Sequence, residues 1–239
     1  MTKPGDHFLT TRWTQVVAAQ GPSTHSGTAL ADLCAAYYAP VQSYIARTAH
    51  DLGDARDLTQ EFFARLLAGR LIAGAEREKG RFRGYLLGAV KHFLADTRDR
   101  LRAAKRGAQH EHVPLVSGTD TSPGHECAAP EPQTPDASFD RQWGFAVLDL
   151  ALTALAAEHE RQGMAGQFQL LKPWLTGDAA DVSQAEAAAR LGLSEGAVKV
   201  AIHRLRKRFR DLVKAEIAET VSTPEEAREE LHYLIVVVS

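Results

Sequence analysis

The residues of this chain that are best suited to chemistry are cations, and they gather in two segments. From Glu76 to Glu111, ten Lys and Arg residues stand against five Asp and Glu residues, and from Ser183 to Ala215 eight stand against three. Each segment has a net charge of +5, whereas the whole chain has a formal net charge of -2. Two cationic segments in an otherwise acidic chain indicate two contacts with a polyanion such as nucleic acid.

The second cationic segment has the pattern of a helix-turn-helix. Ala188 is small enough for two helices to cross closely, Gly192 can end the first helix in a left-handed conformation, and Ser194 can cap the second helix. Apolar residues then recur every three or four positions, at Val198, Ile202, Leu205 and Phe209. The pattern predicts a helix that buries one stripe and presents cations on its other faces, as a helix in a DNA major groove does.

Candidate DNA contacts on this second helix are Ser194, Glu195, Lys199, His203, Arg204, Arg206 and Lys207. Lys199 and His203 are the best candidates for contacts with base edges, and Glu195 could accept a hydrogen bond from a cytosine amine. The alternative is an amphipathic helical hairpin whose basic face is merely solvated.

The first cationic segment mixes aromatic and basic residues. Phe82, Tyr85 and Phe93 alternate there with several Arg and Lys residues, a mixture suited to stacking unpaired bases while the backbone is held by cations. Aromatic residues at helical spacing also fit a packed core, so both interpretations stay open.

The elements that must position these residues are helices. Apolar residues recur every three or four positions over about 28–48, 54–68 and 82–105 and again after Phe145, while alternating β-branched runs are absent. Five prolines and no Lys or Arg lie between residues 111 and 138, which predicts a flexible linker. We therefore expect an all-α protein of two small helical bundles, over 28–110 and 139–214, joined by this linker and flanked by extensions over 1–27 and 215–239.

Several function classes are not supported by the sequence. No signal segment or run of about 20 apolar residues is present, and the two cysteines exclude a disulfide framework, so we expect a cytoplasmic protein without membrane contact. No Gly-rich phosphate loop or nucleophile motif indicates an enzyme or a cofactor. A zinc site is an alternative that four residues near the linker could supply, namely His110, His112, His125 and Cys127.

Three stretches together resemble a known family. Ser183 to Phe209 looks like region 4 of the extracytoplasmic-function (ECF) RNA polymerase sigma factors, Asp54 to Leu66 looks like region 2.2, and Gly80 to Arg98 looks like regions 2.3 and 2.4. The resemblance implies a non-enzymatic factor that binds RNA polymerase core, through the β′ clamp helices and the β subunit, and directs transcription from promoter DNA. Region 4 would read the minus 35 element, and region 2 would melt and read the minus 10 element.

The resemblance also assigns roles to residues of the N-terminal half. Polymerase docking falls to Asp54, Asp57, Gln60 and Glu61. The three acidic residues among them have a spacing that places their carboxylates on one helix face. Contacts with the minus 10 element fall to Arg81, Arg83, Tyr85, Lys91, His92, Arg98 and Arg102.

The sequence departs from the family pattern at a few positions. Arg56 stands where an acid is common, His92 where an Asn is common, and Val200-Ala201 where a Ser-Arg pair is frequent. The long linker and C-terminal extension resemble a subgroup linked to Ser/Thr protein kinases instead of a membrane anti-sigma factor. This motivates the hypothesis that Thr59 is phosphorylated and that the added negative charge compensates for Arg56. A stand-alone helix-turn-helix regulator that binds duplex DNA is the alternative function.

Overall fold

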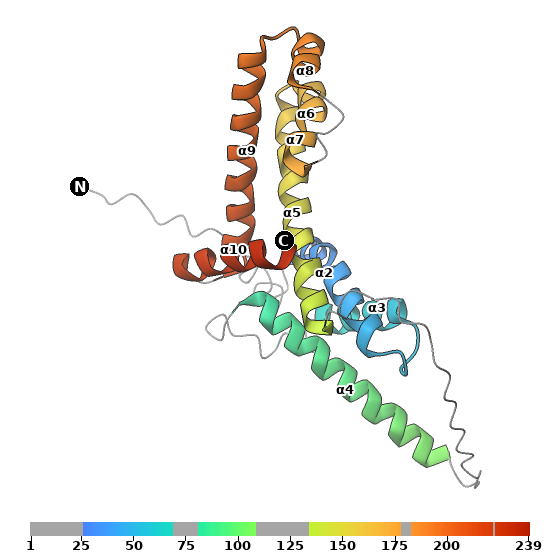
Figure 1. The fold of residues 1–239 in the computed structure, drawn as a ribbon. Helices are drawn as coiled ribbons and strands as arrows, with labels where there is room; N and C mark the ends of the chain where they lie inside the picture. Colours follow the sequence, from blue (N-terminus) through green and yellow to red (C-terminus); the bar gives the residue numbers. More distant parts are fainter. Residues whose placement is uncertain (1–25, 69–80, 109–133, 178–182, 222) are drawn as a thin grey trace, which may run out of the picture.

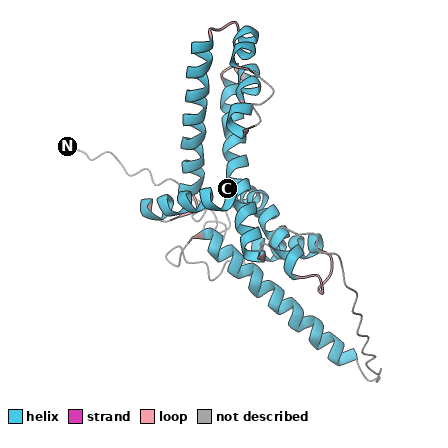
Figure 2. Ribbon diagram, viewed as in Figure 1, coloured by secondary structure: helices cyan, strands magenta, loops and turns pink. Residues whose placement is uncertain are grey.

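The described part of the protein consists of helices with turns and loops between them (Figures 1 and 2). The computed structural model describes residues 26–68, 81–108, 134–177, 183–221 and 223–239, and these contain no strand. The all-α prediction is therefore confirmed. The helices are α2 (Ser26–Thr48), α3 (Ala55–Leu67), α4 (Phe82–Ala108), α5 (Pro135–Arg161), α6 (Ala165–Leu171), α7 (Pro173–Thr176), α8 (Gln184–Leu191), α9 (Glu195–Ala218) and α10 (Pro224–Val238).

Local capping explains where several of these helices begin. The Asp54 side chain accepts hydrogen bonds from the first backbone N–H groups of α3. α8 and α10 each begin with a capping box, formed by Ser183 with Glu186 and by Thr223 with Glu226. These caps satisfy N–H groups that the first turn of a helix leaves without a partner.

The larger of two hydrophobic cores lies between α2, α3, α4 and the first half of α5. Phe62, Phe82 and Phe93 are fully buried there, and the rings of Phe62 and Phe93 meet edge to face at 5.6 Å. Trp143 of α5 and Leu234 of α10 belong to the same core. The core therefore combines residues from both sides of the predicted linker.

A second, smaller core holds the helix-turn-helix together. It is built by α5, α6, α8 and α9, and its buried members are Leu155, Phe168, Leu171, Ala187, Ala188, Val198, Ile202 and Leu205. The long helices α5 and α9 lie side by side and extend from this core to the larger one (Figure 1). Helices α5 and α9 thus contribute residues to both cores and connect them.

The predicted bounds of the linker need a correction. Helix α5 begins at Pro135, with Thr134 as its N-cap, so residues 135–138 are helical. The Ser138 side chain is buried, and its hydroxyl lies 2.8 Å from the Ser43 hydroxyl of α2. Proline is well tolerated in a first helical turn, where no backbone N–H is required. Residues 111–133 of the predicted linker lie outside the described residues, as does most of the predicted N-terminal extension.

Candidate nucleic-acid interface

The helix-turn-helix has the geometry that the sequence predicts. Gly192 ends α8 with φ 65° and ψ 30°, a left-handed conformation that glycine adopts without strain. The Ser194 hydroxyl then accepts a hydrogen bond of 3.2 Å from the Ala197 N–H and caps α9. Ala187 and Ala188 are buried where α8 approaches α9, so small side chains permit the close approach.

Helix α9 separates an apolar face from a cationic one. Val198, Ile202 and Leu205 are buried against α5, α6 and α8, as the apolar spacing predicts. The opposite face exposes Lys199, His203, Arg204 and Lys207, and no ion pair within the described part of the chain engages them. Glu195 is also exposed, at the first turn of α9. A protruding helix with free cations on its outer face can enter a major groove and contact phosphates.

Two other cations of α9 instead attach this helix to its neighbours. The Arg206 guanidinium donates hydrogen bonds of 3.1 and 2.9 Å to the Trp174 carbonyl at α7. Arg208 donates to both carboxylate oxygens of Glu158 on α5, and this interaction holds the pKa of Glu158 below its ordinary value. Arg206, a candidate DNA contact, therefore also holds α9 against α7.

The start of α4 is the second predicted nucleic-acid surface, and here the cations form ion pairs with carboxylates of the same chain. The Arg83 side chain is only 12% exposed. Its Nε donates a 2.9 Å hydrogen bond to Glu230 of α10, and its Nη1 donates to Asp140 of α5. The guanidinium also lies over the rings of Trp143 and Tyr233, 5.0 and 4.4 Å from their centroids.

These contacts determine how Arg83 and Tyr233 titrate. Burial opposes the charge of Arg83, but the hydrogen bonds and charges of Glu230 and Asp140 outweigh it and raise the Arg83 pKa. The Tyr233 hydroxyl donates a 2.5 Å hydrogen bond to Asp140. Burial, followed by this hydrogen bond, raises the pKa of Tyr233 to about 12.

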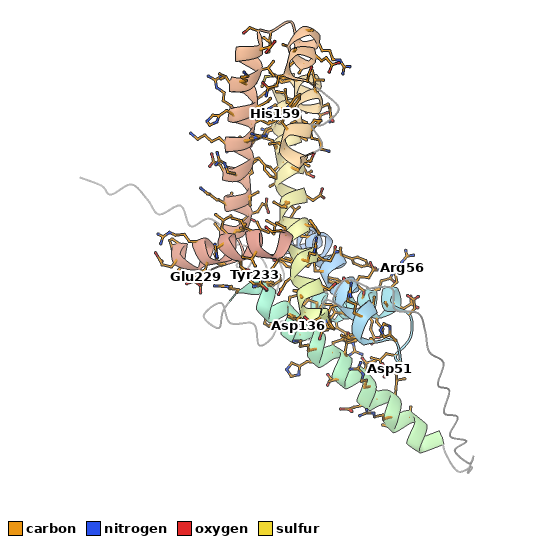
Figure 3. All side chains as sticks on the ribbon, viewed as in Figure 1. Asp51, Arg56, Asp136, His159, Glu229 and Tyr233 are labelled. Atoms are coloured by element: carbon orange, nitrogen blue, oxygen red, sulfur yellow. The ribbon has the colours of Figure 1, made fainter. Side chains whose placement is uncertain are left out.

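The neighbouring cations are held in the same way. Arg81 lies 2.5 Å from Glu229 and 2.9 Å from Glu230, so α10 supplies a carboxylate pair to this end of α4. Lys91 donates a 2.7 Å hydrogen bond to Asp136 in the first turn of α5, and this hydrogen bond raises the Lys91 pKa. Figure 3 labels Glu229, Tyr233 and Asp136 around the start of α4.

Farther along α4, most of the other predicted minus 10 residues also have partners in the protein. Arg98 donates to the Thr48 carbonyl and lies 3.5 Å from Asp51, which fixes the end of α2. Tyr85 is half-buried beside Phe82, and burial raises its pKa. His92 and Arg102 are exposed, and Arg102 lies 3.8 Å from Asp99.

The two interpretations of the aromatic residues can now be separated. Phe82 and Phe93 are fully buried, so both are core residues and cannot stack bases in this structure. Arg81, Arg83, Lys91 and Arg98 were expected to face nucleic acid, and the structure instead pairs them with carboxylates and a carbonyl of the same chain. Sequence patterns do not reveal these partners, because each lies 45 or more positions away along the chain.

Helix α3 presents part of the predicted docking face. Asp57 and Gln60 are exposed, while Asp54 is exposed but serves as the N-cap. Glu61 is half-buried and pairs with Arg65 at 2.5 Å, with Arg100 of α4 at 3.7 Å. The carboxylates available to a partner are thus those at the start of the helix.

Thr59 does not have the position expected of a phosphorylated residue. Its side chain is 0% exposed, and its hydroxyl donates a 2.6 Å hydrogen bond to the Ala55 carbonyl. A phosphate has no room there while α3 is packed. Burial therefore argues against modification of the folded domain, whereas the exposed Arg56 points away from the molecule (Figure 3).

Two further expectations concern metals and membranes. Among the described residues, no group of three or more His, Cys, Asp and Glu could hold a metal ion. The four residues considered for zinc lie outside the described residues, namely His110, His112, His125 and Cys127. Within the described helices, none has the length and apolar character needed to cross a bilayer.

Comparison with known proteins bears on the helix-turn-helix. Residues 178–209 match the family model described as Sigma-70, region 4. No curated protein and no solved structure matches the chain. The matched segment contains α8 and the exposed cationic half of α9. This part of the chain is therefore similar to a non-enzymatic DNA-binding module of sigma factors, which supports a role in promoter recognition.

Proposed function

We propose that this protein is an ECF-type sigma factor that binds RNA polymerase core and directs transcription initiation. The observation that carries the proposal is the free cationic face of α9, presented by a helix-turn-helix that matches Sigma-70 region 4. Such a factor acts in the cytoplasm, where polymerase and promoter DNA are found. It needs no cofactor and no catalytic residue, because the polymerase performs the chemistry.

In this proposal α9 reads the minus 35 element. Its N-terminal half enters the major groove, where Lys199 and His203 face base edges and Glu195 faces a cytosine amine. Arg204 and Lys207 then face phosphates, which position the helix without selecting a sequence. The departure from the family at Val200-Ala201 falls on this helix, so the preferred promoter should differ from that of members with a Ser-Arg pair.

The N-terminal bundle would supply the remaining contacts. Asp54, Asp57 and Gln60 of α3 are exposed and suit a basic docking surface on the β′ clamp helices. The cations at the start of α4 would hold the minus 10 strand once their present partners are displaced. A kinase acting on Thr59 would require α3 to unpack first, and an anti-sigma factor would compete with polymerase for α3 or α4.

Run-off transcription with core polymerase on a promoter library tests the proposal. The protein should direct transcription from a subset of promoters, and Lys199→Ala should change that subset. Lys214→Ala is the matched control, because Lys214 is exposed on the same helix but lies about 22 Å from Lys199 at 1.5 Å per residue. Absence of promoter-dependent transcripts, together with absence of binding to core polymerase, would refute the proposal.

A second candidate function is a stand-alone regulator of duplex DNA. It is favoured by one observation: in this structure α9 offers free cations, whereas those at the start of α4 are paired within the chain. A footprint made by the protein alone that is as strong as the footprint with core polymerase would favour this second function.

A further inference from the structure

We propose that α10 is a releasable inhibitory clamp on the cationic start of α4. The clamp would keep the chain closed until a nucleic-acid strand displaces the α10 carboxylates. The inference rests on the proposed function in one respect, which is that α4 receives a DNA strand. It goes beyond that function because it assigns a role to the C-terminal helix.

The charges of α10 face α4 in a selective way. Of its four Glu residues, Glu229 and Glu230 contact Arg81 and Arg83, while Glu225 pairs with Arg228 of the same helix at 3.5 Å. Carboxylate and phosphate oxygens accept the same forked hydrogen bonds from Arg. The two carboxylates therefore stand where phosphates of a bound strand would stand, and the two occupants exclude each other.

The segment that joins α9 to α10 also covers the start of α4. The N–H of Phe82 donates a 3.3 Å hydrogen bond to the Thr220 carbonyl, in the segment that joins α9 to α10. The Thr220 and Val221 side chains are buried. The chain thus covers the first turn of α4 with backbone as well as with charge.

The C-terminal half of α10 packs closely against α5. Leu234 is buried, and a Cβ added at Gly144 would meet Cγ1 of Val238 at 2.6 Å. Figure 1 shows α10 crossing α5 close to the start of α4. Glycine at position 144 is therefore what allows α10 to approach α5, in the middle of a helix where glycine otherwise destabilises.

Release of α10 is mechanically simple. The helix has its own capping box, and Ile235 and Val236 on its outer side are exposed. A ligand that binds the open state shifts the population toward it, and the clamp reduces the apparent affinity to the intrinsic affinity multiplied by the fraction of open chains. A strand that binds the freed arginines also repels the acidic α10 and opposes reclosure.

A disulfide between α10 and α5 tests the clamp. Gly144→Cys and Val238→Cys are placed in a Cys34→Ser, Cys127→Ser background, because the 2.6 Å approach puts the two positions within reach of a disulfide. A thiol assay verifies the bond, and fluorescence anisotropy measures binding of a labelled single-stranded dT oligonucleotide. The reduced form should bind about tenfold more tightly than the oxidised form. The Cys34→Ser, Cys127→Ser chain that keeps Gly144 should do the same, and it serves as the reference in which no new Cβ crowds α10. The exposed face of α9 contributes equally to all three.

Equal affinities in the two forms would overturn the clamp, and so would failure of both forms to bind the strand. The same samples are then assayed by run-off transcription with core polymerase. If the strand affinities differ but neither form supports transcription, the proposed function fails and the clamp stands. If both forms bind the strand and transcribe equally well, α10 gates neither step and the clamp is refuted.

Charge variants give a second measurement that needs no new covalent bond. Glu230→Gln removes a carboxylate that binds Arg81 and Arg83, and Glu225→Gln removes the same charge from a site that does not touch α4. Strand affinity should rise several-fold for Glu230→Gln and stay close to wild type for Glu225→Gln. Equal changes would mean that general charge, and not the clamp, governs binding.

Discussion

Arg83→Met should destabilise the protein far more than the loss of a surface cation. The substitution keeps much of the apolar stem of the side chain, but it leaves Asp140 without a guanidinium and leaves Glu230 with Arg81 as its only cation among the described residues. The Glu230 side chain is only 1% exposed, so water cannot solvate it in place of Arg83. Loss of one partner of a buried ion pair costs about 3 to 5 kcal/mol of unfolding free energy. Contacts with the Trp143 and Tyr233 rings are lost as well.

Lys91→Met is the matched control. It also removes a cation that joins α4 to α5, but the Lys91 and Asp136 side chains are 47% and 50% exposed. An exposed pair of this kind contributes about 0 to 1 kcal/mol because water and salt screen it. The two variants thus differ mainly in the burial of the pair.

The assay is equilibrium unfolding in urea, because guanidinium is itself a salt that screens charges. With a slope of about 3 kcal/mol per molar urea, a loss of 4 kcal/mol lowers the midpoint by about 1.3 M. Adding Glu230→Gln to Arg83→Met should restore part of the loss, since one of the two acidic side chains that lost Arg83 is then neutral. If Arg83→Met lowers the midpoint no more than Lys91→Met, the buried cluster does not hold α10, α5 and α4 together.

Three other predictions concern the turn, the clamp tyrosine and the recognition helix. Gly192→Ala should lower the free energy of unfolding by about 1 kcal/mol, because a φ of 65° is strained for a residue with a Cβ. Gly196→Ala, in the first turn of α9, should not lower it. Since the Tyr233 pKa is raised from 10.0 to about 12, its contribution is present below pH 10 and lost toward pH 12. Partial exposure limits this loss to about 1 kcal/mol, measured as the difference between wild type and Tyr233→Phe in urea unfolding. In DNA-binding assays Lys207→Ala should flatten the salt dependence by about one unit for all sequences, whereas Lys199→Ala should alter preference at one position by about 1 to 3 kcal/mol.

The helix-turn-helix could be predicted from sequence because its determinants are local. The capping serine, the small residues, the left-handed glycine and the apolar stripe all lie within residues 183–209, and each acts on a neighbour a few positions away. The paired capping boxes of α8 and α10 belong to the same class of short-range signal. Agreement among such signals predicts a structure without knowledge of the rest of the fold.

The partners of the first cationic segment could not be predicted in that way. Arg83 is separated from Asp140 by 57 positions and from Glu230 by 147. Charge counted by segment shows an excess of cations but not which carboxylates fold back on them. The aromatic residues were equally ambiguous, because the spacing of Phe82 and Phe93 fits a buried helix face as well as a base-stacking surface. The C-terminal end of the linker was placed too far along the chain, because proline suits the first turn of a helix as well as a linker.

The placement of the two cationic surfaces implies an order of events for the proposed function. The face of α9 that would contact duplex DNA is open in the closed chain, whereas the start of α4 is covered by α10. Val213 and Ile217 of α9 are buried in the larger core, so α9 does not depend on α10 alone for its anchorage. Release of α10 would therefore remove Glu229 and Glu230 from Arg81 and Arg83 without detaching the recognition helix, and the strand would then compete with Asp140 alone for Arg83. Duplex contact can then precede strand capture, and only a strand that reaches α4 while α9 is engaged gains both sets of cations.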